Sequence, residues 1–160
     1  MTDPMTPEGL DFRTVSPRLA TVRVVSSLIG VAPLLIAAAL GAVLLAKWLW
    51  IVFAALLVLS LWILWLIPRQ VRAMRYALSD DEFCIRRGVM FRSLTLIPYG
   101  RIQYVEVSEG PIARKFGIAE IQLHTASAST DATLNGVPVE EAARLRDMLA
   151  ERGSAELAGL

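Results

Sequence analysis

The chain has 160 residues, and its 16 Lys and Arg against 15 Asp and Glu leave a formal net charge of +1. A nucleic-acid-binding protein would carry a strong basic excess, so this charge balance argues against that class. A disulfide framework within the chain is excluded because Cys84 is the only cysteine. Hydrophobic residues make up 55% of the sequence and concentrate in residues 24–67, where Lys47 is the only charge. The composition therefore predicts a short membrane module joined to one small soluble domain.

After a leading segment at 1–23, two uncharged runs at 24–46 and 48–67 predict a transmembrane helical hairpin over residues 24–67. Each run has the length of about 20 apolar residues that crosses a hydrocarbon core of about 30 Å, and Lys47 leaves room only for a tight turn. One alternative is a cleaved signal peptide, although its apolar region is shorter and no second span follows it directly. The other is a buried core hairpin of a soluble protein, which is also apolar on every face.

The basic residues beside the two runs predict the orientation of the hairpin. Three arginines precede the first run, three follow the second, and only Lys47 lies between the runs. The positive-inside rule then predicts that both termini and the soluble domain lie in the cytoplasm. The six flanking arginines are Arg13, Arg18, Arg23, Arg69, Arg72 and Arg75.

From Arg75 onward the apolar period changes to two, which predicts short antiparallel strands with one apolar and one polar face. Turns are expected at residues 79–82, at Gly88 and at residues 98–100, where charged residues, glycine or proline interrupt the alternation. One short helical segment is expected at residues 111–117. The strands would together form a small, strongly bent sheet.

A final helix is predicted from Pro138 to Gly153, because proline suits the first helical position and glycine suits a stop. Residues 68–153 should therefore form one cytoplasmic domain, a bent antiparallel sheet or partial barrel with this C-terminal helix, followed by a loose tail at 154–160. The predicted fold class is a membrane-anchored α+β protein. The expected core residues are Phe83, Ile85, Leu94, Leu96, Val105, Val107, Ile121, Leu123, Leu145 and Leu149.

Several short motifs after the hairpin follow a distinctive order. They are Tyr76-Ala77-Leu78, Ile85-Arg86-Arg87-Gly88, Ile97-Pro98, Arg101-Ile102, Gly110-Pro111, Arg114, Phe116-Gly117 and Thr125-Ala126. Together they resemble the bacterial PH-domain family of membrane-flanked proteins, the YdbS-like proteins, formerly a domain of unknown function, over roughly residues 13–152. The resemblance implies a PH-like domain on the cytoplasmic face of the bacterial inner membrane, with no catalytic residues and no cofactor.

One turn departs from the lipid-binding eukaryotic PH domains, which gather Lys and Arg around the first hairpin to bind phosphoinositide phosphates. The corresponding turn here is Asp80-Asp81-Glu82, whose three negative charges would repel a phosphate at close range. Phosphoinositide recognition through this turn is therefore not expected.

Few residues could carry catalysis or hold a metal ion. His124, the only histidine, is predicted on the exposed face of a strand, and Cys84 is predicted beside Arg86 on the polar face as an inert thiol. One His and one Cys are too few for a zinc site, and the polar loop at 127–131 lacks the Gly-x-Ser-x-Gly setting of a serine nucleophile. The sequence therefore predicts a protein that is not an enzyme.

Arginines are the candidate contact residues: Arg69, Arg72, Arg75, Arg86, Arg87, Arg92 and Arg101. The first three follow the second span, where they fix topology and contact anionic headgroups. The other four lie in an acid-free stretch at 83–105, although Arg86 and Arg87 are adjacent and should point to opposite sides of a strand.

These features favour a non-enzymatic interaction or scaffold module that contacts membrane lipids and belongs to a membrane protein assembly. The expected protein partner is another PH-like membrane protein or a second copy of the chain, and no nucleic acid is expected. The alternative is anionic lipid-headgroup binding through an arginine-rich face.

Overall fold

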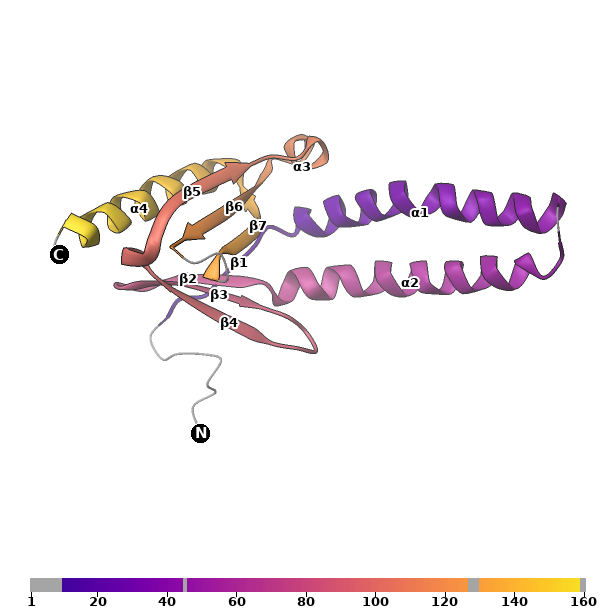
Figure 1. The fold of residues 1–160 in the computed structure, drawn as a ribbon, viewed down its shortest axis with the longest axis horizontal. Helices are drawn as coiled ribbons and strands as arrows, with labels where there is room; N and C mark the ends of the chain where they lie inside the picture. The colour runs from indigo at the N-terminus through magenta and orange to yellow at the C-terminus, as the bar shows by residue number, and fades with distance from the viewer. Residues whose placement is uncertain (1–9, 45, 127–129, 159–160) are drawn as a thin grey trace.

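The computed structural model of the chain describes residues 10–44, 46–126 and 130–158. Two long helices lead into two small antiparallel sheets and a C-terminal helix (Figure 1), which confirms the predicted fold class. The helices are α1 (Arg18–Leu44), α2 (Leu49–Ala73), α3 (Pro111–Lys115) and α4 (Val139–Ala158), with a 3-10 turn η1 (Tyr99–Arg101). The strands are β1 (Arg13–Thr14), β2 (Arg75–Leu78), β3 (Glu82–Arg87), β4 (Ser93–Pro98), β5 (Ile102–Ser108), β6 (Ile118–Thr125) and β7 (Ala132–Pro138).

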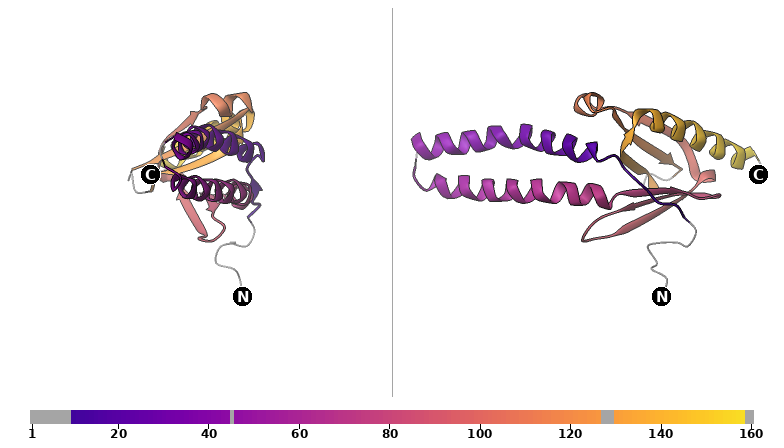
Figure 2. Two further views of the ribbon diagram at one scale, coloured as in Figure 1. Left: turned by 90° about the vertical axis from the view of Figure 1, so that its right-hand side faces the viewer. Right: turned by 180° about the vertical axis from the view of Figure 1, so that it is seen from behind.

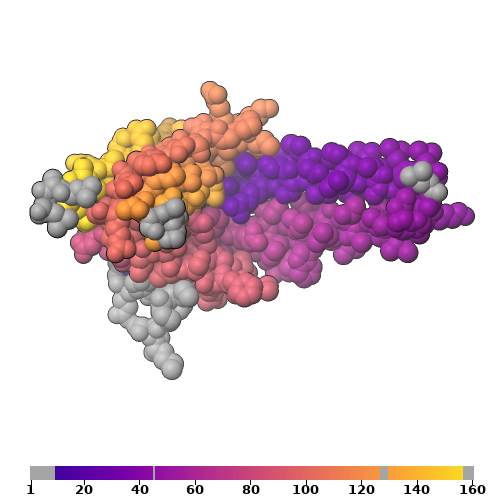
Figure 3. Space-filling view, in the orientation of Figure 1, coloured from indigo at the N-terminus to yellow at the C-terminus, as the bar shows by residue number. Residues whose placement is uncertain are grey.

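The helices α1 and α2 lie side by side as a rod that leaves one end of the sheet domain (Figure 3). Both are long and apolar enough to cross a membrane, and only 6% of the most apolar stretch of each is buried. Such exposure argues against the core hairpin of a soluble protein, because large apolar side chains left in water cost free energy. Both helices continue through an internal proline, Pro33 in α1 and Pro68 in α2.

The strands form a four-stranded sheet in the order β1-β2-β3-β4 and a three-stranded sheet in the order β5-β6-β7, all antiparallel. The helix α4 covers the second sheet and also contacts η1 (Figure 1). Strand β1 was not expected from the sequence. It pairs Arg13 with Tyr76, so part of the expected N-terminal segment at 1–23 belongs to the first sheet, while residues 1–9 lie outside the described residues.

The core lies between the inner faces of the two sheets and α4. Most expected core residues are confirmed there: Phe83, Ile85, Ile121, Leu123, Leu145 and Leu149 are buried, and Val105 and Val107 pack against them half-buried. The expectation for Leu94 and Leu96 is wrong, since Leu96 is 45% exposed and Ile97 is buried instead. The register places Ile97 opposite Phe83, and a shift of one residue along a strand moves a side chain to the other face.

The ends of both long helices are part of this same core. Leu19 at the start of α1 and Val71 at the end of α2 belong to the hydrophobic cluster of the sheets. Gly136 in β7 has φ +81°, and a Cβ there would lie 2.7 Å from Leu19, so only glycine lets α1 approach this closely. The hairpin and the sheet domain therefore share one core instead of being joined by a linker.

The helix α4 continues to Ala158, so the predicted stop at Gly153 is wrong. Gly153 instead allows close packing, because a Cβ there would lie 3.3 Å from the Tyr99 carbonyl oxygen. Two side chains hold this end of α4 in place: Arg152 donates to the Ser79 carbonyl at 2.8 Å, and Glu156 accepts from the Gly100 N–H at 2.7 Å. This part of α4 thus fastens the far end of the domain.

A pair of leucine variants tests the position of the core. Leu149→Ala should lower the free energy of unfolding by about 2–5 kcal/mol, because the fully buried side chain would leave a cavity. Leu96→Ala should cost less than about 1 kcal/mol, since this leucine lies on the outer face. Urea titration with pulse proteolysis of the full chain in detergent measures both, and equal costs would contradict the register of β4.

Candidate functional site

Five of the seven candidate arginines converge where α2 enters the sheet domain. Arg69 and Arg72 are three residues apart on the last turns of α2, so they share one side of that helix. Arg75 and Arg86 face each other across β2 and β3 and lie on the same face of the sheet. Arg92 belongs to the connection between β3 and β4, directly before β4 begins.

These five arginines line one pocket of about 360 Å³, together with Ala73, Gly88 and Val89. The lining residues include no acid, and within the described part of the chain none of the five arginines forms an ion pair with a carboxylate. Clustered guanidinium groups without a counterion create a positive potential that attracts anions. The planar guanidinium also matches phosphate oxygens in a bidentate geometry.

The remaining two candidates lie elsewhere. Arg87 points to the other side of β3 and lines a different groove with Arg23 and Arg69. Burial lowers the pKa of Arg87 and the nearby Arg23 lowers it further, while Glu120 raises it. Arg101 ends η1, at the end of the domain opposite the long helices (Figure 1). The structure therefore splits the second predicted arginine group.

The groove beside Arg87 is larger, at about 680 Å³, and mainly apolar. One wall is α2, with Trp62, Trp65 and Leu66, and the other is the connection between β3 and β4, with Met90 and Phe91. This connection projects toward the long helices, along the end of α2, in Figure 1 and in the right-hand view of Figure 2. The sequence predicted only a turn at this position, and the signal that could have revealed the groove is the apolar run at 89–91 between two strands.

Comparison with known proteins identifies the fold around this site. Residues 19–153 match the model of a family described as bacterial PH domain. The chain belongs to the bacterial PH domain family. The family match confirms the resemblance drawn from the short motifs.

Two curated relatives come from Bacillus subtilis (strain 168). The chain is 32% identical over 88 residues to the UPF0699 transmembrane protein YdbS, covering 52% of this chain and 52% of YdbS. It is 29% identical over 100 residues to the UPF0699 transmembrane protein YdbT, covering 59% of this chain and 20% of YdbT. The chain therefore spans about half the length of YdbS and about a fifth of YdbT. No solved structure matches it.

The acidic turn Asp80-Asp81-Glu82 of this bacterial PH domain lies far from the arginine pocket. It joins β2 to β3 at the end of the domain opposite the long helices (Figure 1), where Arg152 holds the Ser79 carbonyl. The five pocket arginines thus lie at the end that carries the helices, and the acidic turn lies at the other end.

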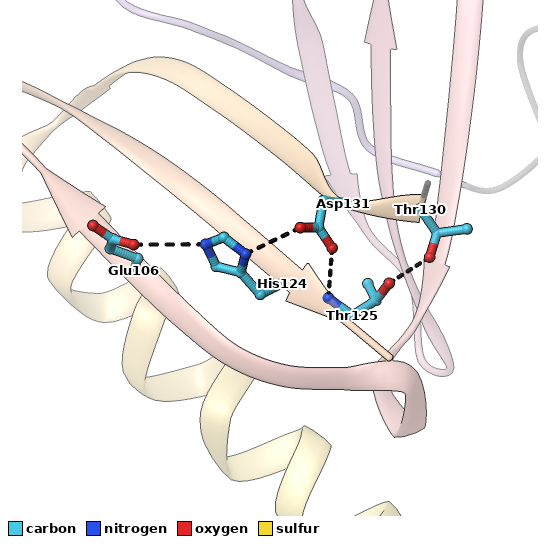
Figure 4. Close-up of polar contacts among 5 residues, drawn as sticks. All are labelled: Glu106, His124, Thr125, Thr130 and Asp131. Atoms are coloured by element: carbon cyan, nitrogen blue, oxygen red, sulfur yellow. Dashed lines mark hydrogen bonds and ion pairs between the residues drawn. The ribbon is translucent and has the colours of Figure 1, made fainter. Parts of the chain in front are cut away.

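His124 lies in a polar cluster on the second sheet of the bacterial PH domain (Figure 4). Its Nδ1 is 3.1 Å from Asp131 Oδ2 and its Nε2 is 3.6 Å from Glu106 Oε2, while its ring stacks on Tyr104. The side chain is only 18% exposed, so it is more covered than the predicted open strand face. The contacts of the ring tie β5 and β6 to Asp131, the residue directly before β7, while Nε2 makes no hydrogen bond with any of the described residues.

Other chemical sites find little support in the structure. Cys84 is buried, which corrects its predicted place on an open polar face, and burial raises the pKa of its thiol to about 11, with Glu82 adding to the shift. A thiol in this state is protonated and unreactive at neutral pH. The described residues include no group of three or more His, Cys, Asp or Glu that could hold a metal ion, and the serines at 127 and 129 lie outside the described residues.

The polar cluster predicts a pH dependence of stability. The Thr125 N–H donates to the Asp131 carboxylate at 2.9 Å, which, with the adjacent His124, holds the pKa of Asp131 below its ordinary value of 3.8. The unfolded chain therefore takes up this proton first as the pH falls, so the stabilisation is present above pH 3.8 and lost as the pH falls through the folded-state pKa.

Asp131→Asn should consequently reduce the loss of stability on acidification below about pH 4. Urea midpoints of the full chain at a series of pH values measure the slope, with Asp147→Asn on α4 as a control for removing one carboxylate. An Asp131→Asn slope identical to that of the unaltered chain would contradict the assignment.

Proposed function

We propose that this protein is a non-enzymatic, membrane-anchored PH-like module that binds anionic phospholipid headgroups through the arginine pocket. The observation that carries the proposal is the convergence of five arginines, without an acid among the lining residues, at the end of an apolar helix. It supports the lipid alternative of the sequence analysis over the scaffold role. Recruitment of a protein partner, another PH-like membrane protein or a second copy, stays a prediction.

The pocket has the position that a headgroup site needs. Arg69 follows the apolar stretch of α2 almost directly, and its guanidinium lies 3.5 Å from the centre of the Trp65 ring. Tryptophan side chains favour the membrane interface, so this pair marks the level of the headgroups. Arg86 and Arg92 come from the sheet domain and line the same pocket. A phosphate bound there would therefore be contacted by arginines of α2 on one side and by arginines of the sheet domain on the other.

The proposed location is the cytoplasmic face of a bacterial inner membrane, with both termini inside the cell. The support is the excess of arginines on the domain side over the single Lys47 at the turn. The cytoplasmic leaflet carries anionic lipid, and each basic residue near its surface contributes about 1 kcal/mol to the free energy of binding. The proposed topology and the proposed ligand therefore support each other.

A matched pair of double variants tests headgroup binding. Arg86→Gln with Arg92→Gln removes two pocket charges without touching the arginines that fix topology. At about 1 kcal/mol each, the affinity for phosphatidylglycerol should fall roughly tenfold to thirtyfold. Native mass spectrometry of the full chain in mild detergent measures the bound lipid, with phosphatidylcholine as the neutral comparison.

The control is Arg101→Gln with Arg146→Gln, which removes the same charge from exposed sites outside the pocket. It should leave the preference for phosphatidylglycerol unchanged, and raised salt should weaken binding by the unaltered chain. Equal losses in both double variants would show a general charge effect and overturn the pocket as the site.

Cysteine labelling tests the topology. Lys47→Cys should react with a membrane-impermeant maleimide in intact bacterial cells, whereas Ser154→Cys on α4 should react only after the cells are opened. The native Cys84 is buried, so the unaltered chain should give little background. Reaction of the cysteine at position 154 in intact cells would place the domain on the outer side.

A further inference from the structure

The tip of the β3–β4 hairpin exposes an apolar run that the arginine pocket does not explain. Met90 is 83% exposed, Phe91 is 88% exposed, and Val89 beside them is also exposed. These are large side chains on the outermost turn of a soluble domain, where polar residues are the rule. Their free-energy cost in water disappears if an apolar phase covers them.

The direction of the tip identifies that apolar phase. Met90 and Phe91 line the same groove as Trp62 and Trp65 of the apolar helix α2. Trp62 lies seven residues before Arg69, which corresponds to about 10 Å along a helix axis. The tip therefore reaches the depth to which amphipathic segments enter the boundary between headgroups and acyl chains.

The backbone holds the tip in this position. Gly88 has φ +98°, and a Cβ there would lie 1.8 Å from the Phe91 carbonyl oxygen. Any other residue would have to open the turn, because the clash is with backbone. The glycine thus fixes a tight, projecting tip.

We propose that the β3–β4 tip inserts into the membrane leaflet on the side of the sheet domain, and that an acyl chain of a bilayer phospholipid fills the groove between the tip and α2. The groove is apolar along Trp62, Trp65 and Phe91, as an acyl chain requires. Arg23 and Arg87 line it as well, which provides positive charge for the phosphate of the same lipid. The inference rests on the proposed membrane location but not on the arginine pocket.

Depth-dependent quenching tests the insertion in the full chain. Met90→Cys is labelled with the fluorophore NBD, and the protein is reconstituted into vesicles of phosphatidylcholine brominated on its acyl chains. The emission should be blue-shifted and strongly quenched relative to vesicles without bromine. Leu96→Cys is the matched control, because it replaces an exposed apolar residue on β4 that does not line the groove, and it should be neither shifted nor quenched.

Three results would overturn the inference. Water-like emission at position 90 would mean that the tip stays outside the bilayer. Equal quenching at positions 90 and 96 would mean that the tip enters the bilayer no more deeply than the rest of the β3–β4 hairpin. A blue shift without quenching would mean that protein, such as a second copy of the chain, covers the tip. Phosphatidylcholine carries no net charge, so insertion of the tip can be observed even if the arginine pocket does not bind anionic headgroups. Binding of anionic headgroups can likewise be observed even if the tip does not insert.

Discussion

The packing of both long helices into the core of the sheet domain is the constraint on which the other features depend. Leu19 against Gly136 fixes the start of α1, and Val71 fixes the end of α2. With two attachments instead of one flexible linker, the domain has a set orientation relative to the helices. The arginines of α2 and those of β3 can therefore share one pocket, and the β3–β4 tip keeps its place beside α2.

Most of the fold was predicted from local sequence patterns. Uncharged runs predicted α1 and α2, alternation predicted the strands after α2, and the predicted burial of Leu145 and Leu149 on α4 was confirmed. The errors arose where tertiary packing decides. Residues 94–97 contain three apolar positions, so the phase of β4 follows only from its register with β3. Gly153 signals a helix stop in isolation, but here it provides close contact with Tyr99.

The candidate site was predictable only in part, because its residues come from separate elements. The spacing of Arg69 and Arg72 already places them on one side of a helix. Their meeting with Arg86 depends on the pairing of β2 with β3 and on the angle at which α2 enters the sheet, neither of which is encoded locally. Arg101 shares the same acid-free stretch, yet η1 carries it to the opposite end of the domain.

The lengths of the two helices have a consequence for how the domain responds to its bilayer. The uncharged part of α1, from residue 24 to its end at Leu44, corresponds to about 30 Å, which matches a hydrocarbon core of about 30 Å. A bilayer thinner than this stretch is accommodated by tilt, so thinning of the bilayer changes the angle of the hairpin. Because the domain is attached through its core, it follows that tilt, and bilayer thickness sets the height of the arginine-bearing turns above the acyl chains.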